Sequence, residues 1–257
     1  MAGKQSVFVG GRFSTNQGFE VEVVKYNNAR DVQVVFNDAA RTSIRVEAAQ
    51  LKRGSLRNPN HPTYLGIGFI GVGPYKTKGP DNKFTKEYIV WNGMLNRCYS
   101  ENVYIRNSCP TYDDCTVDEQ WHNFQEFSEW YNFQVGSNKE GYQLDKDLLK
   151  RGNKVYGPEN CILLPKDLNT LIVTRKGGRG EFLIGASWDK KKQKFIAQGN
   201  FGVGTRWMGQ FDTELEAHLA YKKNKELYIK SMANVWKGKI DERAYLTLMK
   251  YEVNLDD

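Results

Sequence analysis

The sequence of 257 residues predicts an α+β protein made of several small modules. Near the start, apolar and polar residues alternate with the period of half-buried strands. In the middle, aromatic residues recur at helical spacing. The last third combines three short apolar runs with one long helical pattern. We therefore expect a first module at residues 1–75, a linker at 76–87, a second module at 88–174 and a third at 175–257.

The first module predicts a small β barrel of about five strands, because short alternating runs follow one another at regular intervals. The runs cover residues 19–23, 32–34 and 42–46, and pairs of Gly, Asn or Asp lie between them. Residues 64–73 predict a further strand that packs closely on a neighbour, with glycine where side chains would clash. The same residues contain Gly-x-Gly-x-x-Gly, but no helix pattern follows, which argues against a dinucleotide site.

The linker is polar and contains Gly79-Pro80. After it, Trp91, Met94 and Leu95 fit one face of a helix. A second helix is predicted where aromatic residues recur every three or four positions: Trp121, Phe124, Phe127, Trp130 and Tyr131. Such spacing spreads the aromatic side chains around much of the helix surface. We interpret them as core residues rather than as a surface on which bases stack.

Residues 142–172 read as strand, turn, strand and helix. The first strand ends in Asp145, Lys146 and Asp147, and Asn160 precedes the second strand. Asn169 lies on the helix, nine residues after Asn160.

This pattern resembles the ββα core of the HNH nucleases. The resemblance implies that Asp145 and Asn169 hold Mg²⁺ and that Asn160 steadies the loop, and it places Lys146 where the general-base His belongs. A lysine of ordinary pKa is a poor base at neutral pH. Asp147 is an alternative base or ligand. The candidate catalytic residues are therefore Asp145, Lys146, Asp147, Asn160 and Asn169, and whether the site is enzymatic stays open.

The order of these patterns along the chain also resembles a group of bacteriophage proteins identified as HNH or homing-endonuclease-like. The shared features are the Trp91 helix, the Trp121 helix, Leu144-Asp-Lys-Asp and Tyr156-x-Pro-Glu-Asn-Cys161. Members of that group commonly have a basic residue in place of the His. The resemblance therefore implies a phage-encoded protein of the host cytoplasm, with or without nuclease activity.

In the third module, apolar runs at residues 182–188, 194–198 and 206–211 predict three strands. The first two are joined by a lysine-rich turn at 189–193. Thr213 and Glu216 then form the pattern of a capping box at the start of a helix. Small and aromatic residues at helical spacing extend this helix to at least residue 228, and residues 241–251 predict a final short helix.

The basic charge concentrates in this module. Residues 175–206 contain eight basic and two acidic residues, a net charge of +6 out of +7 for the whole chain. A focused basic region is the pattern expected of a protein that binds a polyanion.

The third module resembles the Apetala-type DNA-binding domain of plant ethylene-response factors and phage homing endonucleases. The matching segments are Gly185-Ala-Ser-Trp188-Asp, Lys194-Phe-Ile-Ala, Met208-Gly-x-Phe211-Asp-Thr and the helix residues from Glu216 to Tyr221. The resemblance implies a three-stranded sheet in the major groove, backed by the helix. The candidate DNA-binding residues are Arg175, Lys176, Arg179, Trp188, Lys190, Lys191, Lys192, Lys194, Arg206 and Trp207.

Two functions follow as expectations, both with double-stranded DNA as the partner. In the first, the protein is a metal-dependent, site-specific endonuclease or nickase of homing type. In the second, it binds DNA without cutting, as a transcription repressor or a decoy. A third possibility is an anti-defence or structural factor that binds a protein and reuses the same scaffold. We also expect a further DNA or protein contact through the first module. No membrane partner is expected, because no apolar run approaches the ~20 residues that span a bilayer.

Overall fold

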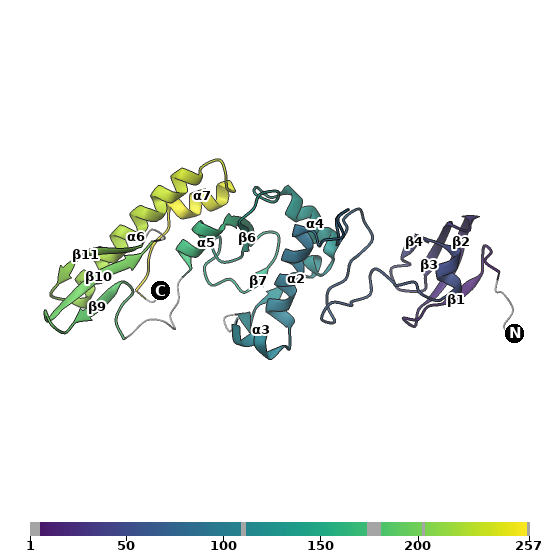
Figure 1. Cartoon of the computed structure of the whole chain (residues 1–257), viewed down its shortest axis with the longest axis horizontal. Helices are drawn as coiled ribbons and strands as arrows, with labels where there is room; N and C mark the ends of the chain where they lie inside the picture. Colours follow the sequence, from purple (N-terminus) through teal and green to yellow (C-terminus); the bar gives the residue numbers. More distant parts are fainter. Residues whose placement is uncertain (1–5, 109–111, 174–180, 202–203, 256–257) are drawn as a thin grey trace. The chain divides into compact units, whose positions relative to one another are not determined.

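The computed structural model describes residues 6–108, 112–173, 181–201 and 204–255. The chain forms two compact units, each described here by itself. The first contains Met1–Asp113 and Val117–Glu129, and the second contains Asp114–Thr116 and Trp130–Asp257. The predicted α+β class is confirmed, because helices and several small sheets occur together in the described residues (Figure 1).

The first unit begins with an antiparallel sheet of four strands in chain order. These are β1 (Arg12–Ser14), β2 (Glu20–Asn28), β3 (Asp31–Phe36) and β4 (Ser43–Val46), followed by the short helix α1 (Ala48–Lys52). Alternate residues of β2 and β3 are fully buried, among them Val21, Val23, Val32 and Val34. The predicted alternation of these strands is therefore confirmed.

The predicted barrel is wrong, because this sheet, like the other sheets of the described residues, stays open. Residues 64–73, expected as a further strand, form turns with isolated bridges instead. Leu65 and Gly66 have positive φ angles of 53° and 72°, and the Gly68 amide donates to the Tyr64 carbonyl at 2.9 Å. A left-handed pair reverses the chain direction, so no strand continues through it.

Three of the four glycines of this segment lie where side chains would clash, as predicted, whereas a Cβ atom at Gly66 would meet open space. A Cβ atom at Gly68 would lie 2.6 Å from Cδ1 of Leu95, and one at Gly71 would lie 2.1 Å from Oδ1 of Asn123. Glycine therefore lets this backbone approach the helical part of the first unit closely.

That helical part contains α2 (Lys86–Tyr99), α3 (Val103–Ser108), a 3₁₀ turn (Glu119–His122) and the start of α4 (Phe124–Phe133). The predicted linker leads directly into α2, whose first turn is capped by Thr85. Trp91, Trp121 and Phe124 are fully buried, and the Trp91 Nε1 donates to the Trp121 carbonyl at 2.8 Å. The interpretation of these aromatic residues as core is confirmed.

In the second unit, β6 (Tyr142–Asp145) pairs antiparallel with β8 (Ile162–Pro165), and α5 (Lys166–Ile172) follows at once. The predicted order of strand, turn, strand and helix is thus confirmed. Between them, β7 (Val155–Tyr156) is short, and the Thr116 amide of β5 (Thr116–Val117) donates to the Lys154 carbonyl beside it.

A second sheet follows in the same unit, with β10 (Lys194–Asn200) in the centre between β9 (Ala186–Asp189) and β11 (Thr205–Phe211). Helix α6 (Glu214–Trp236) packs along this sheet and is followed by α7 (Glu242–Met249) (Figure 1). The predicted capping box is present, because the Thr213 Oγ1 accepts from the Glu216 amide while the Glu216 side chain accepts from the Thr213 amide.

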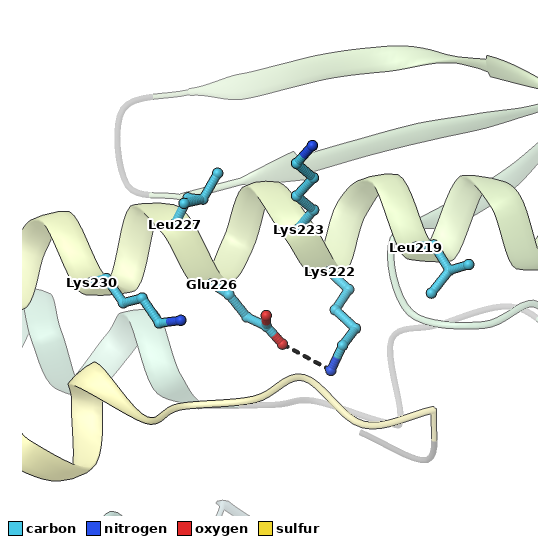
Figure 2. A pocket seen from close by; sticks show the side chains of 6 residues that line it. All are labelled: Leu219, Lys222, Lys223, Glu226, Leu227 and Lys230. Atoms are coloured by element: carbon cyan, nitrogen blue, oxygen red, sulfur yellow. Dashed lines mark ion pairs between the residues drawn. The ribbon is translucent and has the colours of Figure 1, made fainter.

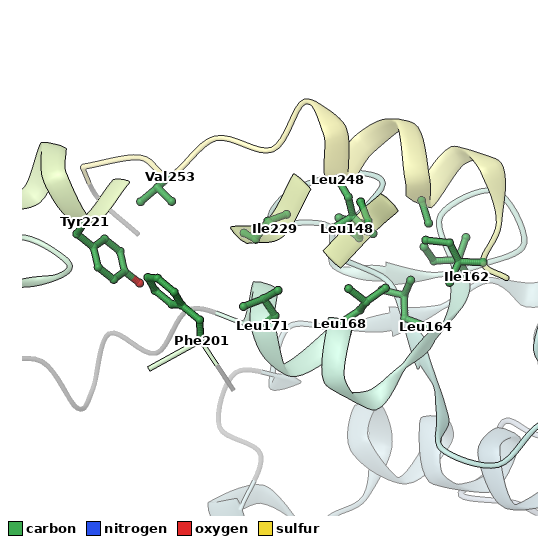
Figure 3. Packing of buried hydrophobic residues seen from close by; sticks show 13 residues of the cluster. Leu148, Ile162, Leu164, Leu168, Leu171, Phe201, Tyr221, Ile229, Leu248 and Val253 are labelled. Atoms are coloured by element: carbon green, nitrogen blue, oxygen red, sulfur yellow. The ribbon is translucent and has the colours of Figure 1, made fainter. Parts of the chain in front are cut away.

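One buried apolar cluster joins the ββα elements to α6 and α7. Leu164 and Leu168 come from β8 and α5, whereas Ile229 and Leu248 come from α6 and α7 (Figure 3). The cluster therefore runs across the module boundary expected at residues 174 and 175. No described helix combines the length and the apolar character that crossing a lipid bilayer requires.

Candidate nucleic-acid interface

The two faces of the β9–β11 sheet can be told apart from the strand register. Residues paired across antiparallel strands point to the same face, and neighbours along a strand point to opposite faces. Ala197 is fully buried, and a Cβ atom at Gly199 would lie 2.5 Å from Cε2 of Tyr221 on α6. Alternate residues of β10 from Phe195 therefore face the helix, and those from Lys194 face away from it.

The face turned away from α6 carries amides, hydroxyls, an aspartate, a lysine, an isoleucine and a tryptophan. Trp207 is paired with Gln198, Thr205 with Asn200 and Gln210 with Ile196. We call this the open face, and it comprises Ser187, Asp189, Lys194, Ile196, Gln198, Asn200, Thr205, Trp207 and Gln210. The Trp207 residue is 63% exposed.

A lysine-rich turn joins β9 to β10 at one end of this sheet. The Asp189 Oδ1 accepts from the amides of Lys191 and Lys192 at 2.9 and 3.3 Å, and Gln193 closes the turn with a φ of 52°. The side chains of Lys190, Lys191 and Lys192 are exposed. Lys194 lies just beyond the turn and forms an ion pair with Asp212.

Two predicted DNA-binding residues do not lie on the open face. Trp188 is paired with Phe195, contacts its ring at 4.8 Å between centroids and is only partly exposed. Arg206 is exposed but is paired with Gly199, so it starts from the face that α6 covers. Arg175, Lys176 and Arg179 lie outside the described residues.

The open face also contains residues that the sequence analysis did not select. Gln198 and Gln210 are exposed amides on the same face as Trp207. They are neither basic nor aromatic, the two residue types on which the prediction of DNA contacts was based. The available signal was the alternation along each strand, which puts residues two positions apart on the same face. Gln198 lies two residues before the polar Asn200, and Gln210 lies two residues before the polar Asp212.

The predicted catalytic residues surround the loop after β6. Asp145 is buried, and its Oδ1 accepts from the amides of Asp147 and Leu148 at 3.1 and 2.8 Å. Burial raises the pKa of this carboxyl group, and the two amide hydrogen bonds oppose the rise. Asp145 therefore fixes the turn that follows its own strand.

Lys146 is also buried, at 5% exposure. Its Nζ donates to the Asp147 Oδ1 at 2.7 Å and to the Asn153 carbonyl at 2.8 Å, and it lies 5.8 Å from the centre of the Tyr156 ring. The Asn153 Nδ2 in turn donates to the Lys146 carbonyl at 2.9 Å. The lysine is thus a hydrogen-bond donor that holds the loop together.

Asn160 and Asn169 each donate a side-chain hydrogen bond. The Asn160 Nδ2 lies 3.5 Å from the Val155 carbonyl, and the Asn169 Nδ2 donates to the Gln143 Oε1 at 3.0 Å. Within the described residues, the buried Asn169 Oδ1 has no hydrogen-bond partner. By contrast, Oδ1 of Asp145, the other predicted ligand residue, already accepts from backbone amides.

These residues fit a magnesium ion poorly. Mg²⁺ requires near-octahedral oxygen ligands, usually with one or two carboxylates. Here one oxygen of Asp145 already accepts two amides, and the next side chain in sequence is a buried ammonium group. Across the described ranges, no three His, Cys, Asp or Glu side chains gather in a group that could hold a metal ion. The expected Mg²⁺ site at Asp145 and Asn169 stays a prediction.

Comparison with known proteins gives no match to this chain, either among family models, among curated proteins or among solved structures.

Proposed function

We propose that this protein binds double-stranded DNA through the open face of the β9–β11 sheet, without cutting it. The observation that carries the proposal is the exposure of Trp207 on a strand face that also presents Gln198, Gln210 and Thr205. Tryptophan is among the residue types that contribute most to binding energy at interfaces, and here it lies beside side chains that can form hydrogen bonds.

The chemistry of the open face suits a major groove. β-Strands enter that groove in several kinds of DNA-binding protein, and glutamine can form two hydrogen bonds with adenine. The indole of Trp207 offers an apolar surface for thymine methyl groups or sugars, and the turn lysines suit neighbouring phosphates. Binding without cutting is what a repressor or a DNA decoy requires.

The experiment that tests the proposal exposes the full chain to a duplex library of phage and host DNA, once with Mg²⁺ and once with EDTA. We expect gel-shift binding that weakens as salt rises, equal in both buffers, and no new DNA ends by sequencing. Absence of binding at low salt would refute DNA recognition. New ends that need Mg²⁺ and disappear in Asp145→Ala would instead support the endonuclease.

The lysine-rich turn between β9 and β10 allows a prediction about the salt dependence of binding. Changing Lys190, Lys191 and Lys192 to Ala should weaken binding at low salt and flatten the plot of log affinity against log salt. Each lost phosphate contact reduces that slope by about 0.9, so the total change is at most about three. The matched control changes Lys237, Lys239 and Lys250, which are exposed elsewhere in the same unit. If both triple variants lower the slope equally, the turn has no special role.

A further inference from the structure

Helix α6 has an outer face that the sheet does not cover. Leu219, Lys222, Lys223, Glu226, Leu227 and Lys230 line a shallow hollow of about 320 Å³ there, and Figure 2 shows their side chains along the helix. We call these six residues the outer α6 face. Successive helix residues turn by about 100°, so this face lies roughly opposite Ala217 and Tyr221, which are buried on the other side of the helix.

The outer α6 face exposes large apolar side chains. Leu219 and Leu227 are 51% and 59% exposed, and they stand two turns apart. Leu215, one turn before Leu219, is also exposed and extends the row. Leu215, Leu219, Lys223 and Leu227 thus form one row at four-residue spacing, and such a row is the ridge that packs into the groove of another helix.

The charge on this face is unbalanced. Glu226 is its one acidic residue, and it forms an ion pair with Lys222 at 2.8 Å and accepts from the Val253 amide at 2.9 Å. Lys222 also donates to the Val253 carbonyl at 2.6 Å, so this pair ties down the C-terminal segment. Among the described residues, Lys223 and Lys230 have no ion-pair partner. The face therefore offers two available cations beside two exposed leucines.

We propose that the outer α6 face binds an acidic amphipathic helix of another protein. An apolar side chain of that helix enters the hollow between Leu219 and Leu227, and its carboxylates pair with Lys223 and Lys230. A second copy of the chain is the poorer occupant, because two such faces would bring like charges together. Duplex DNA is also poorer, because the leucines gain nothing from a phosphate backbone.

The position of this face has a consequence for DNA binding. The sheet lies against one side of α6, and the open face points away from the helix. A helix bound to the outer α6 face therefore leaves Trp207 accessible. The protein can hold DNA and an acidic partner at the same time, which extends the proposed function to that of an adaptor.

The test uses a labelled synthetic helical peptide with leucines on one face and glutamates along both borders. A matched peptide carries lysine in place of each glutamate. We expect fluorescence anisotropy to show binding of the acidic peptide to the full chain and none of the basic peptide. The variants Lys223→Glu with Lys230→Glu, and Leu219→Ser with Leu227→Ser, should each weaken binding about tenfold or more.

Lys237→Glu with Lys239→Glu is the charge-matched control and should bind the acidic peptide like the original chain. Circular dichroism checks that every variant stays folded. The proposal is overturned if the acidic peptide fails to bind, or if the Lys223 and Lys230 changes weaken it no more than the control does. It is also overturned if those changes instead abolish self-association in analytical ultracentrifugation or reduce DNA affinity. If the chain binds the acidic peptide but not DNA, the proposed function is refuted, and the proposal that the outer α6 face binds an acidic helix remains.

Discussion

At the scale of single residues, Trp207 is the side chain on which we expect the proposed DNA binding to depend most. It stands on the open face with Gln198 as its cross-strand partner. We predict that Trp207→Ala weakens duplex binding by about 2 kcal/mol, the loss typical of an interface anchor. Because its side chain is largely exposed, the free energy of unfolding should change by less than about 0.5 kcal/mol. Fluorescence anisotropy and urea denaturation measure the two quantities.

Trp188 provides the contrast, since its ring contacts Phe195 and lies on the α6 side of the sheet. Trp188→Ala should lower the free energy of unfolding, and the folded variant should keep its DNA affinity. If Trp188→Ala reduces affinity in a stably folded protein while Trp207→Ala does not, the faces have been assigned the wrong way round.

Lys146 illustrates how a buried charge can serve the fold. Lys146→Met keeps most of the side-chain volume but removes the donor from the buried Asn153 carbonyl. An unsatisfied buried acceptor costs about 1–3 kcal/mol, and we expect the free energy of unfolding to fall by that amount in urea denaturation.

Asp147→Asn is the matched control for this effect. The Asp147 side chain is half exposed, so loss of its charge should cost less than about 1 kcal/mol. Equal and small effects of both substitutions would contradict the role we assign to the Lys146 ammonium.

At the scale of elements, most strands and helices could be predicted, but the faces of β11 could not. Strict alternation back from Phe211 would place Trp207 on the α6 side and Arg206 on the open face. A bulge at Met208 intervenes, since Ala197 pairs with Gly209 while Gln198 pairs with Trp207. One extra residue exchanges the two faces, and the neighbouring Gly209, with a φ of 135°, fits a bulge but does not by itself show which residue is the extra one.

The start of α6 shows the opposite case, in which the sequence alone identified both the cap and its geometry. Thr213→Ala removes the hydroxyl that accepts from the Glu216 amide. Loss of such a cap costs about 1 kcal/mol, so we predict a decrease of that size in the free energy of unfolding. Hydrogen exchange should quicken at the Glu216 and Ala217 amides.

Thr213→Ser retains the hydroxyl and should restore most of the stability and the protection of the first turn. If Thr213→Ala leaves exchange at these amides unchanged, the first turn of α6 is held by its contacts with the sheet rather than by the capping box.

At the scale of the whole molecule, the contacts of the candidate catalytic residues could not be predicted from the sequence. The burial of each side chain depends on its packing against residues that are distant in the sequence. The spacing of Asp145, Asn160 and Asn169 identified the ββα elements, and β6, β8 and α5 have the expected order. The sequence could not show that Lys146 turns inward and is held by Asn153, nor that the Asn169 Nδ2 donates to Gln143. The Lys146 contact depends on how the loop after β6 closes, and the Asn169 contact depends on how α5 packs against β6.

One continuous apolar core connects the ββα elements of the second unit with α6 and α7. Leu168 on α5 is fully buried in the cluster that also contains Ile229 of α6 and Leu248 of α7. Leu168→Ala should lower the free energy of unfolding by about 2–5 kcal/mol through loss of burial and the cavity left behind. Because the cluster is shared, hydrogen-exchange protection should decrease together in β8 and in the middle of α6.

Leu246→Ala is the matched control, because this leucine of α7 is half exposed and should cost much less. If protection falls in β8 while α6 keeps its original values, the ββα elements and the β9–β11 sheet are independent modules, as the sequence predicted. If both fall together, damage near Asp145 also weakens DNA binding by loosening the helix that supports the sheet. A loss of binding in a site variant must therefore be compared with its stability before it is assigned to catalysis.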